Sequence, residues 1–243
     1  MCGWAKWLGV LLVVMATGCA ESVVETRPGV SLELARERSD RLANVQYQLR
    51  FDIPRELRDS IAASVHISFD LADNEAPLLL DYRQARASLH SLRINGQEAK
   101  IHFADEHLVL PAGELQRGRN EVAIDFVAGD SSLNRNPDFL YTLFVPDRAR
   151  TAFPLFEQPD LKARFELTLV VPADWQALAN GPLLAATALG AGRTEYRFAP
   201  TEPISSYLFS FVAGDFQSIT RAVDGRARTL LHRQTNAAQR ARR

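Results

Sequence analysis

The sequence predicts an all-β fold, built as a sandwich or as a saddle-shaped assembly of antiparallel sheets. Three observations predict it. Apolar and polar residues alternate with a period of two in many short stretches, which is typical of strands with one buried face. These stretches recur about every ten residues between turn-forming residues. Few windows show the period of 3.6 residues that an amphipathic helix requires.

The clearest alternation lies in Val45–Phe51 and Val65–Leu71, which we predict as the first two strands. The charge-rich stretch Glu33–Asn44 leads into the first of them. Shorter alternating or apolar stretches predict the remaining strands. These are Leu78–Tyr82, Leu89–Ile94, Ala99–Phe103, Leu108–Leu110, Val122–Phe126, Leu140–Val145, Phe165–Val171, Leu183–Ala188, Thr194–Phe198, Ser206–Val212, Phe216–Ala222 and Arg228–His232.

Three short segments predict hairpin turns between neighbouring strands. Asn95-Gly96 and Asp224-Gly225 are the residue pairs that two-residue hairpin loops prefer. Gly190-Ala191-Gly192 separates a third pair of strands. The last segment, Gln234–Arg243, has helix-forming composition, so we expect a short helical C-terminal end.

Composition indicates a globular domain with no nucleic-acid partner. The 243 residues are 47% hydrophobic, which suffices for a packed core. The formal net charge of −1 gives no general attraction to nucleic acid. The arginines between Arg221 and Arg243 lack the interleaved aromatic residues on which bases stack. We interpret them as a solvated surface.

Residues 1–18 predict a lipoprotein signal peptide. Lys6 precedes the apolar run Leu8–Val14, which is too short to span a bilayer. The following Ala16-Thr17-Gly18-Cys19 resembles a bacterial lipobox, with Ala16 at the position of the usual Leu. An ordinary signal peptide that is cut near Ala20 is the alternative.

The lipobox interpretation makes Cys19 the lipidated first residue of the mature chain. Cys2 is the only other cysteine, and it leaves with the signal, so no disulfide can form. Residues 19–31 are polar and aperiodic, as expected of a tether between membrane and domain. We therefore expect an exported protein of the bacterial cell envelope that is lipid-anchored to a membrane. The expected membrane is the outer one, on its periplasmic side or at the surface.

The sequence contains no recognised catalytic or metal-binding motif. Neither H-E-x-x-H, G-x-S-x-G nor a phosphate-binding glycine loop occurs. His102 and His107 are five residues apart in a strand-and-turn region, which favours exposed turn histidines over a metal site. Glu157 and Asp160 flank Pro159, where charged residues at the rim of a packed turn are favoured over a site pair. We expect no catalytic residue and no metal in this chain.

The most patterned segment is Phe139–Gly181, which holds two predicted strands around the loop Ala152–Pro159. Loops are ordinarily polar and solvated. This loop reads Ala-Phe-Pro-Leu-Phe-Glu-Gln-Pro. Its apolar side chains must therefore pack against the core of the domain or against a neighbouring domain.

Three segments resemble the N-terminal domain of the aminopeptidase N family, the zinc metallopeptidases also called membrane alanyl aminopeptidases. Ala152–Phe165 is similar to the signature Ala-Phe-Pro-Cys-Phe-Asp-x-Pro-x-x-Lys-Ala-x-Phe, with Leu155 and Glu157 at the Cys and Asp positions. Val171–Gly181 is similar to a strand that ends in an Asn-Gly turn. Pro203–Phe216 follows the pattern Met-Ser-x-Tyr-Leu-x-x-Phe-x-x-Gly-Asp-Phe. The resemblance extends from about Leu32 to the end.

The resemblance implies a saddle-shaped β domain, at residues 32–228, that packs against a separate zinc-binding catalytic domain. Residues 229–243 would begin the connection to that domain, whose motifs are absent from this sequence. Zinc is therefore expected only in the catalytic domain. We expect the loop Ala152–Pro159, the central loop, to dock on the catalytic domain through a set of five residues. These are Phe153, Pro154, Phe156, Glu157 and Pro159.

The resemblance also singles out Leu143. Many relatives carry a Gln or Glu there, which helps to hold the free amino group of the substrate. Such a contact needs an acceptor oxygen, which leucine lacks.

Three functions remain open on this sequence. The first is the non-catalytic N-terminal domain of an exported, lipid-anchored zinc aminopeptidase that removes N-terminal residues from peptides, here truncated before its catalytic domain. The second is a stand-alone β-sandwich lipoprotein that acts as a binding or scaffold module. The third is a distinct enzyme within the sandwich.

Overall fold

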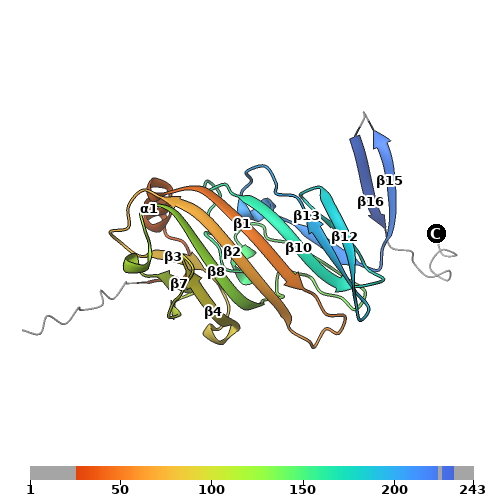
Figure 1. Cartoon of the computed structure of the whole chain (residues 1–243), viewed down its shortest axis with the longest axis horizontal. Coiled ribbons are helices and arrows are strands. Elements are labelled where there is room, and N and C mark those ends of the chain that lie inside the picture. The colour runs from red at the N-terminus through yellow and green to blue at the C-terminus, as the bar shows by residue number, and fades with distance from the viewer. Residues whose placement is uncertain (1–25, 224–225, 233–243) are drawn as a thin grey trace, which may run out of the picture.

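The computed structural model describes residues 26–223 and 226–232, and it confirms the predicted all-β class. Figure 1 shows an elongated body of strands with the hairpin β15–β16 standing apart at one end. The predicted lipidation residue Cys19, the Asp224-Gly225 turn and the helical end at 234–243 lie outside the described residues.

One large sheet forms one wall of the body. Its strand order is β12-β13-β10-β1-β2-β8-β4-β5. In this order the strands span Leu183–Gly190, Arg193–Phe198, Arg164–Pro172, Leu42–Asp52, Ile61–Leu71, Gly118–Ala128, Leu89–Ile94 and Gln97–Glu98. All neighbours are antiparallel except the pair β1 and β10, which run parallel.

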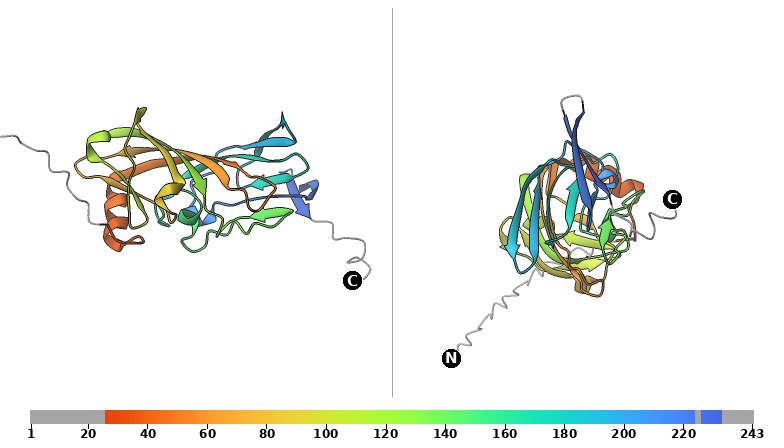
Figure 2. Two further views of the ribbon diagram at one scale, coloured as in Figure 1. Left: turned by 90° about the horizontal axis from the view of Figure 1, so that it is seen from below. Right: turned by 90° about the vertical axis from the view of Figure 1, so that its right-hand side faces the viewer.

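Two three-stranded sheets lie against the inner face of the large sheet (Figure 2). One contains β3 (Leu78–Asp81), β7 (His107–Leu110) and β6 (His102–Ala104). The other contains β11 (Gln176–Ala179), β14 (Phe211–Gly214) and β9 (Phe139–Tyr141). The separate hairpin consists of β15 (Gln217–Val223) and β16 (Arg226–His232), so the predicted domain boundary at 228 falls inside a strand.

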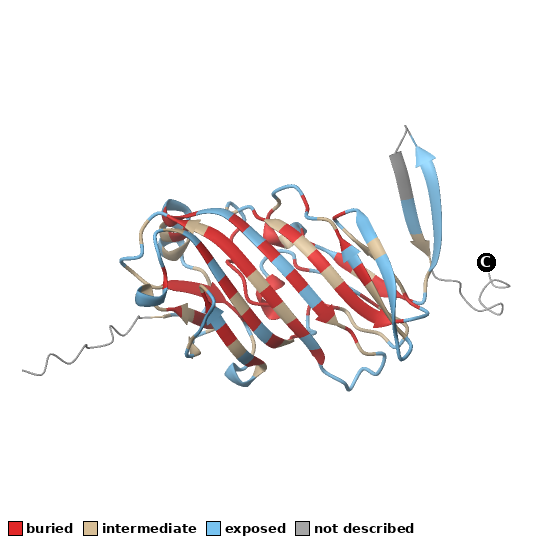
Figure 3. Cartoon of the chain, in the orientation of Figure 1, coloured by how far each residue is buried: buried red, intermediate tan, exposed pale blue. Residues whose placement is uncertain are grey.

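A single hydrophobic core lies between these sheets. In β1 the residues alternate between buried and exposed from Val45 to Phe51, as the period of two predicts. Figure 3 shows the same alternation as bands along the neighbouring strands β2, β8 and β10. Aromatic rings fill the middle of the core, where Phe165 stacks on Tyr47 at 4.9 Å and on Phe209 at 4.7 Å between ring centroids.

The hairpin at Asn95-Gly96 forms as predicted, with φ of 52° and 81° at its two turn residues. Its second strand, however, is Gln97–Glu98, which lies before the predicted Ala99–Phe103 and is only two residues long. The chain then crosses to the next sheet, where β6 pairs with β7. Ile101, just before β6, and Phe103, within it, pack against the core. Their alternation therefore does mark a strand, but this strand pairs with β7 and not with β4.

A helix also forms where none was predicted. Helix α1 spans Leu32–Arg41, inside the charge-rich stretch that leads to β1. The Ser31 hydroxyl caps it by accepting from the Leu34 backbone N–H at 3.1 Å. Its buried residues are Arg38 and Arg41 instead of an apolar stripe. A search for hydrophobic periodicity therefore misses it.

Candidate functional site

The central loop, residues 152–159, packs into the domain's own core. The side chains of Phe153 and Phe156 are almost fully buried. Phe156 lies edge-on to Phe69 at 5.6 Å between centroids. Phe153 meets four rings edge-on at 5.8 to 6.5 Å, those of Tyr47, Phe51, Phe144 and Phe209. The loop thus joins the large sheet to the segments that precede and follow it.

This packing corrects part of the prediction that the loop docks on another domain. Phe153, Pro154, Phe156 and Glu157 are all buried within the described chain, which leaves little of their surface for another domain to contact. Their apolar character reflects the domain's own core, the other alternative that the sequence left open. Only Pro159 is exposed, and its docking role stays a prediction.

A buried charged cluster lies directly behind this loop. The Arg38 guanidinium from α1 donates to both carboxylate oxygens of Asp81, at 2.8 and 2.7 Å. It also donates to the Leu79 carbonyl at 2.6 Å. The backbone N–H of Glu157 donates to Asp81 Oδ2 at 2.8 Å. Burial opposes ionisation of Asp81, but the Arg38 charge and these hydrogen bonds hold the pKa of the carboxyl below its usual value.

His107 completes the cluster from β7, and it is buried rather than exposed as the sequence suggested. Its Nδ1 lies 2.9 Å from Asp81 Oδ1, and its Nε2 lies 2.9 Å from the carbonyl of Arg27. Both neighbours are acceptors, so this environment favours the imidazolium, the form that carries a proton on each ring nitrogen. Burial disfavours that charge, yet the hydrogen bond and charge of Asp81 raise the pKa of His107 overall.

Glu157 anchors two short 3₁₀ turns to the cluster. Its carboxyl accepts from the backbone N–H of Arg150 at 2.6 Å, in the turn Ala149–Thr151. It also accepts from the Ser206 hydroxyl at 3.0 Å, in the turn Ser206–Leu208. Burial raises the pKa of Glu157 to about 7, against the lowering effect of both hydrogen bonds. The residue is a buried anchor, whereas Asp160 is exposed.

The segment that precedes the first of these turns and the second turn itself carry exposed apolar side chains. Tyr141, Leu143 and Val145 alternate outward along the chain, and Leu208 projects from the second turn, each about half exposed. The segments run side by side, because the rings of Phe144 and Phe209 stack at 6.2 Å between centroids beneath them. We call these four side chains, Tyr141, Leu143, Val145 and Leu208, the apolar face.

The backbone beneath the apolar face is held firmly. The Leu143 N–H donates to the Ser132 carbonyl at 2.8 Å. Thr142 and Phe211 bond reciprocally, with the Phe211 N–H donating to the Thr142 hydroxyl at 3.0 Å. A shallow groove of about 290 Å³ adjoins the face between β9, β11 and β14. The exposure of large apolar side chains therefore comes from ordered backbone, which is typical of an interaction surface.

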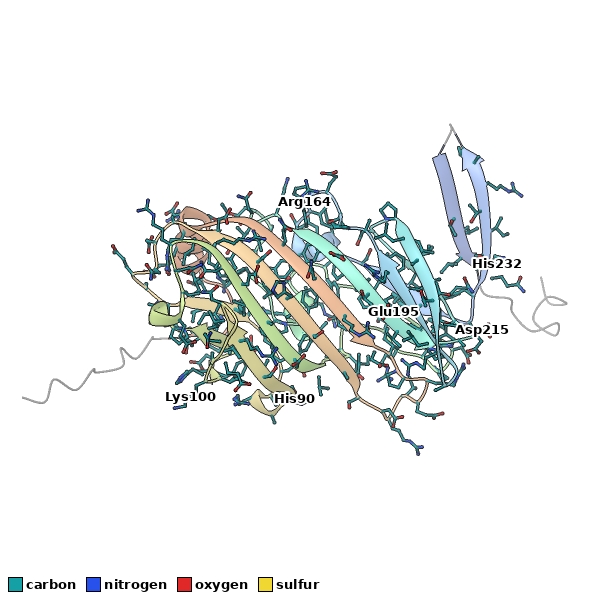
Figure 4. All side chains as sticks on the ribbon, in the orientation of Figure 1. His90, Lys100, Arg164, Glu195, Asp215 and His232 are labelled. Atoms are coloured by element: carbon teal, nitrogen blue, oxygen red, sulfur yellow. The ribbon has the colours of Figure 1, made fainter. Side chains whose placement is uncertain are left out.

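Among the described residues, no group of three His, Cys, Asp or Glu side chains is placed to hold a metal ion. A zinc ion therefore has no fitting donor set in this part of the chain. Figure 4 labels six charged or titratable side chains, from His90 to His232, and they lie on separate elements across the surface. In the described part of the chain, no helix is long and apolar enough to cross a membrane.

Comparison with known proteins decides the family. Residues 43–208 match the family described as the Peptidase M1 N-terminal domain. The chain is 31% identical over 208 residues to aminopeptidase N of Streptomyces lividans, which covers 79% of this chain. The chain belongs to the M1 peptidase family.

Other members of the M1 family give the same result. Aminopeptidase N of Acetobacter pasteurianus is 29% identical over 67% of this chain, and aminopeptidase M1-D of Oryza sativa subsp. japonica is 31% identical over 70%. The chain spans 23%, 44% and 22% of the lengths of these three relatives. An M1 zinc metallopeptidase from Deinococcus radiodurans shares the fold, with a TM-score of 0.63 at 20% identity, over 79% of this chain and 46% of that one.

The M1 match covers the first two resemblance motifs and the start of the third, Pro203–Phe216, but it does not reach the first member of the charged cluster. Arg38 lies before the matched residues 43–208, whereas Asp81, His107 and Glu157 lie within them. No local sequence pattern predicts the charged cluster, because its members come from α1, β3, β7 and the central loop. Only the fold brings them together.

Proposed function

We propose that this chain acts as the non-catalytic N-terminal domain of a zinc aminopeptidase and presents its apolar face to the catalytic domain. The observation that carries the proposal is the apolar face, on a domain whose relatives are full-length aminopeptidases. The chain spans under half the length of those relatives. The H-E-x-x-H motif and zinc ligands are supplied by the catalytic domain, because this sequence contains no such motif.

The proposal extends to Leu143, the central member of the apolar face. Its side chain is 47% exposed, so it is free to border a substrate pocket that the catalytic domain completes. Without an acceptor oxygen it contributes apolar contact and no hydrogen bond to a substrate amino group. Recognition of that group then rests on residues of the catalytic domain.

The proposal includes export and a lipid anchor at Cys19, which rest on the sequence pattern of residues 1–19. Lipidation and cleavage would leave residues 20–31 as the tether from membrane to α1. Membrane fractionation of Cys19→Ala tests this part. Loss of membrane retention is expected, and unchanged retention would contradict the anchor.

A chimera tests the docking role. Residues 26–232 would replace the corresponding domain of Streptomyces lividans aminopeptidase N, and hydrolysis of aminoacyl-anilides would be measured. We expect the chimera to be active. The double variant Leu143→Asp, Leu208→Asp should lower its kcat/KM by at least about tenfold, because uncompensated charges would be buried at the interface. Leu57→Asp is the matched control, since Leu57 is 45% exposed in the loop between β1 and β2. Equal activity of the double variant and the control would contradict the docking role.

The same experiment tests the alternative, a stand-alone binding module. It predicts that the chimera is inactive and that the isolated chain is a complete, stable unit. A distinct enzyme within the domain predicts chelator-sensitive turnover by the isolated chain with added Zn²⁺.

A further inference from the structure

The segment that precedes helix α1 lies against the turn of the β6–β7 hairpin. We call this segment, residues 26–31, the strap. The Thr26 hydroxyl donates to Asp105 Oδ2 at 2.6 Å, in the two-residue turn between β6 and β7. The Arg27 carbonyl lies 2.9 Å from His107 Nε2, at the start of β7. Figure 1 shows α1 and β7 near the end of the body opposite the hairpin β15–β16.

The strap buries little apolar surface. None of its six residues is buried, since Thr26, Gly29 and Val30 are half-buried and the other three are exposed. The first residue of α1, Leu32, is 65% exposed. The hydrophobic effect therefore contributes little to the attachment of the strap, and its polar contacts decide whether it stays on the hairpin.

His107 lies beneath the strap with an acceptor at each ring nitrogen. Nδ1 is 2.9 Å from Asp81 Oδ1, and Nε2 is 2.9 Å from the Arg27 carbonyl oxygen. Neither acceptor has a proton to give, because Asp81 is held ionised beside Arg38. A neutral imidazole carries one N–H and one lone pair, so only the imidazolium can donate to both acceptors.

Loss of one proton from the ring must therefore weaken one of the two contacts. The acceptor in the contact with Asp81 is ionised, and hydrogen bonds to ionised groups are about twice as strong as neutral ones. Neutral His107 therefore keeps its proton on Nδ1, toward Asp81. Its Nε2 lone pair then faces the Arg27 carbonyl oxygen, and the two acceptors repel each other. If the strap leaves, a water molecule can donate to Nε2 instead.

The groups that surround His107 set the pH at which the ring loses this proton. Burial lowers the pKa of His107, and the positive charge of Arg38 from α1 lowers it as well. The Asp81 carboxylate from β3 and the Arg27 carbonyl raise it by more, so the ring loses its proton above the usual pH of about 6.5. The other charged residues beside the ring belong to the turn and to its partner, and they are Asp105, Glu106 and Arg83.

We propose that His107 is a proton-dependent clasp, whose imidazolium holds the strap on the β6–β7 hairpin and whose neutral form releases it. The contact with Asp81 is kept in both forms, so the charged cluster stays together when the strap leaves. Release would add six residues to the tether, a reach of up to about 20 Å. This consequence rests on the proposed lipid anchor at Cys19, whereas the clasp itself does not.

Spin-label mobility tests the clasp. The whole chain, with Cys2→Ser and Cys19→Ser, would carry a nitroxide at Pro28→Cys, an exposed position of the strap. From about pH 5 to about pH 10, the ratio of mobile to immobile label should rise at least about tenfold. An NMR titration of the His107 ring in the unlabelled chain should give the same midpoint. A label at Leu57→Cys, on an exposed loop, is the control and should show no such transition.

Replacement of His107 separates the clasp from a general loosening at high pH. The side-chain amide of His107→Gln can donate to the Arg27 carbonyl and does not titrate, so the transition should disappear. Fluorescence of the buried Trp175 would show that each sample is folded. If His107→Gln does not fold, the coincidence of the two midpoints in the parent chain decides.

Four results would overturn the clasp. They are a label midpoint that differs from that of the ring, a strap that stays immobile while the ring loses its proton, a ring that keeps its proton throughout, and a transition that persists in His107→Gln. None of these measurements involves a membrane. Failure of the clasp is therefore distinct from failure of the anchor at Cys19.

Discussion

Replacement of Glu157 by glutamine should remove a large part of the pH dependence of stability. The carboxyl is 5% exposed and anchors the turns at Arg150 and Ser206. Burial raises its pKa from 4.5 to about 7. An unfolded chain ionises Glu157 above about pH 4.5, whereas the folded chain keeps the proton up to about pH 7. The stability that this group contributes is therefore complete below pH 4.5 and is lost as the pH rises through 7.

The size of the effect follows from the shift. A rise from 4.5 to about 7, at about 1.4 kcal/mol for each pKa unit, corresponds to about 3 kcal/mol. Glutamine has nearly the same shape, and its carbonyl oxygen can accept from the Arg150 N–H and the Ser206 hydroxyl. Glu157→Gln should thus match the wild type at pH 5, within about 1 kcal/mol, and exceed it by about 3 kcal/mol at pH 8.

Urea unfolding at pH 5, 6, 7 and 8 provides the measurement, with the fluorescence of the buried Trp175 as the signal. His107 titrates in both proteins, so its contribution cancels in the comparison. Its raised pKa gives stability that is present below about pH 6.5 and lost as the pH passes its folded value. Parallel stability curves for the wild type and Glu157→Gln between pH 5 and 8 would refute the reasoning.

Three further changes have defined expectations. Asp81→Asn leaves the buried Arg38 and His107 charges without their counterion, and urea unfolding at pH 7 should show a loss of about 3 to 5 kcal/mol. Ser31→Ala removes the side-chain cap of α1, which should cost about 1 kcal/mol in the same assay. Leu143→Gln in the chimera supplies an acceptor at an exposed position, and steady-state kinetics should show a lower KM, by about tenfold if a charge-assisted hydrogen bond forms.

Each of these has a control variant or an outcome that would contradict it. Asp125→Asn removes an exposed carboxylate that accepts from Ser91, and it should cost under about 0.5 kcal/mol. If Asp81→Asn cost no more than Asp125→Asn, the charged cluster would contribute little to the free energy of unfolding. A Ser31→Ala protein with unchanged stability would show that α1 is held by Arg38 and Arg41 alone. For Leu143→Gln, a KM equal to that of Leu143→Met would place the residue away from the substrate.

The fold class and most strands could be predicted because they depend on local alternation. β1, β2, β8 and β10 each bury every second side chain for much of their length, and the period of two is visible in the sequence. Helix α1 could not be predicted, since it buries two arginines, and the partners of Arg38 lie some forty residues away in β3. The same reason hid the buried state of His107, which depends on Asp81.

The apolar face shows a different limit of the sequence. The aromatic, proline-rich loop and the outward side chains of the segments beside it are equally apolar in composition. Only the fold separates them, because it sends Phe153 and Phe156 into the core and leaves Leu143 and Leu208 outside. Burial of the loop residues could therefore not be read from the sequence, which left packing in the core and docking on another domain as equal alternatives.

Chemical labelling of one position tests the central claim most directly. Leu143→Cys, in residues 26–232, would be treated with a maleimide as the isolated domain and within the chimera. Our account predicts rapid labelling in the isolated domain, where Leu143 is 47% exposed, and strong protection in the chimera, with Leu57→Cys labelled at equal rates in both. Equal labelling of Leu143→Cys in an active chimera would contradict the claim that the apolar face docks on the catalytic domain.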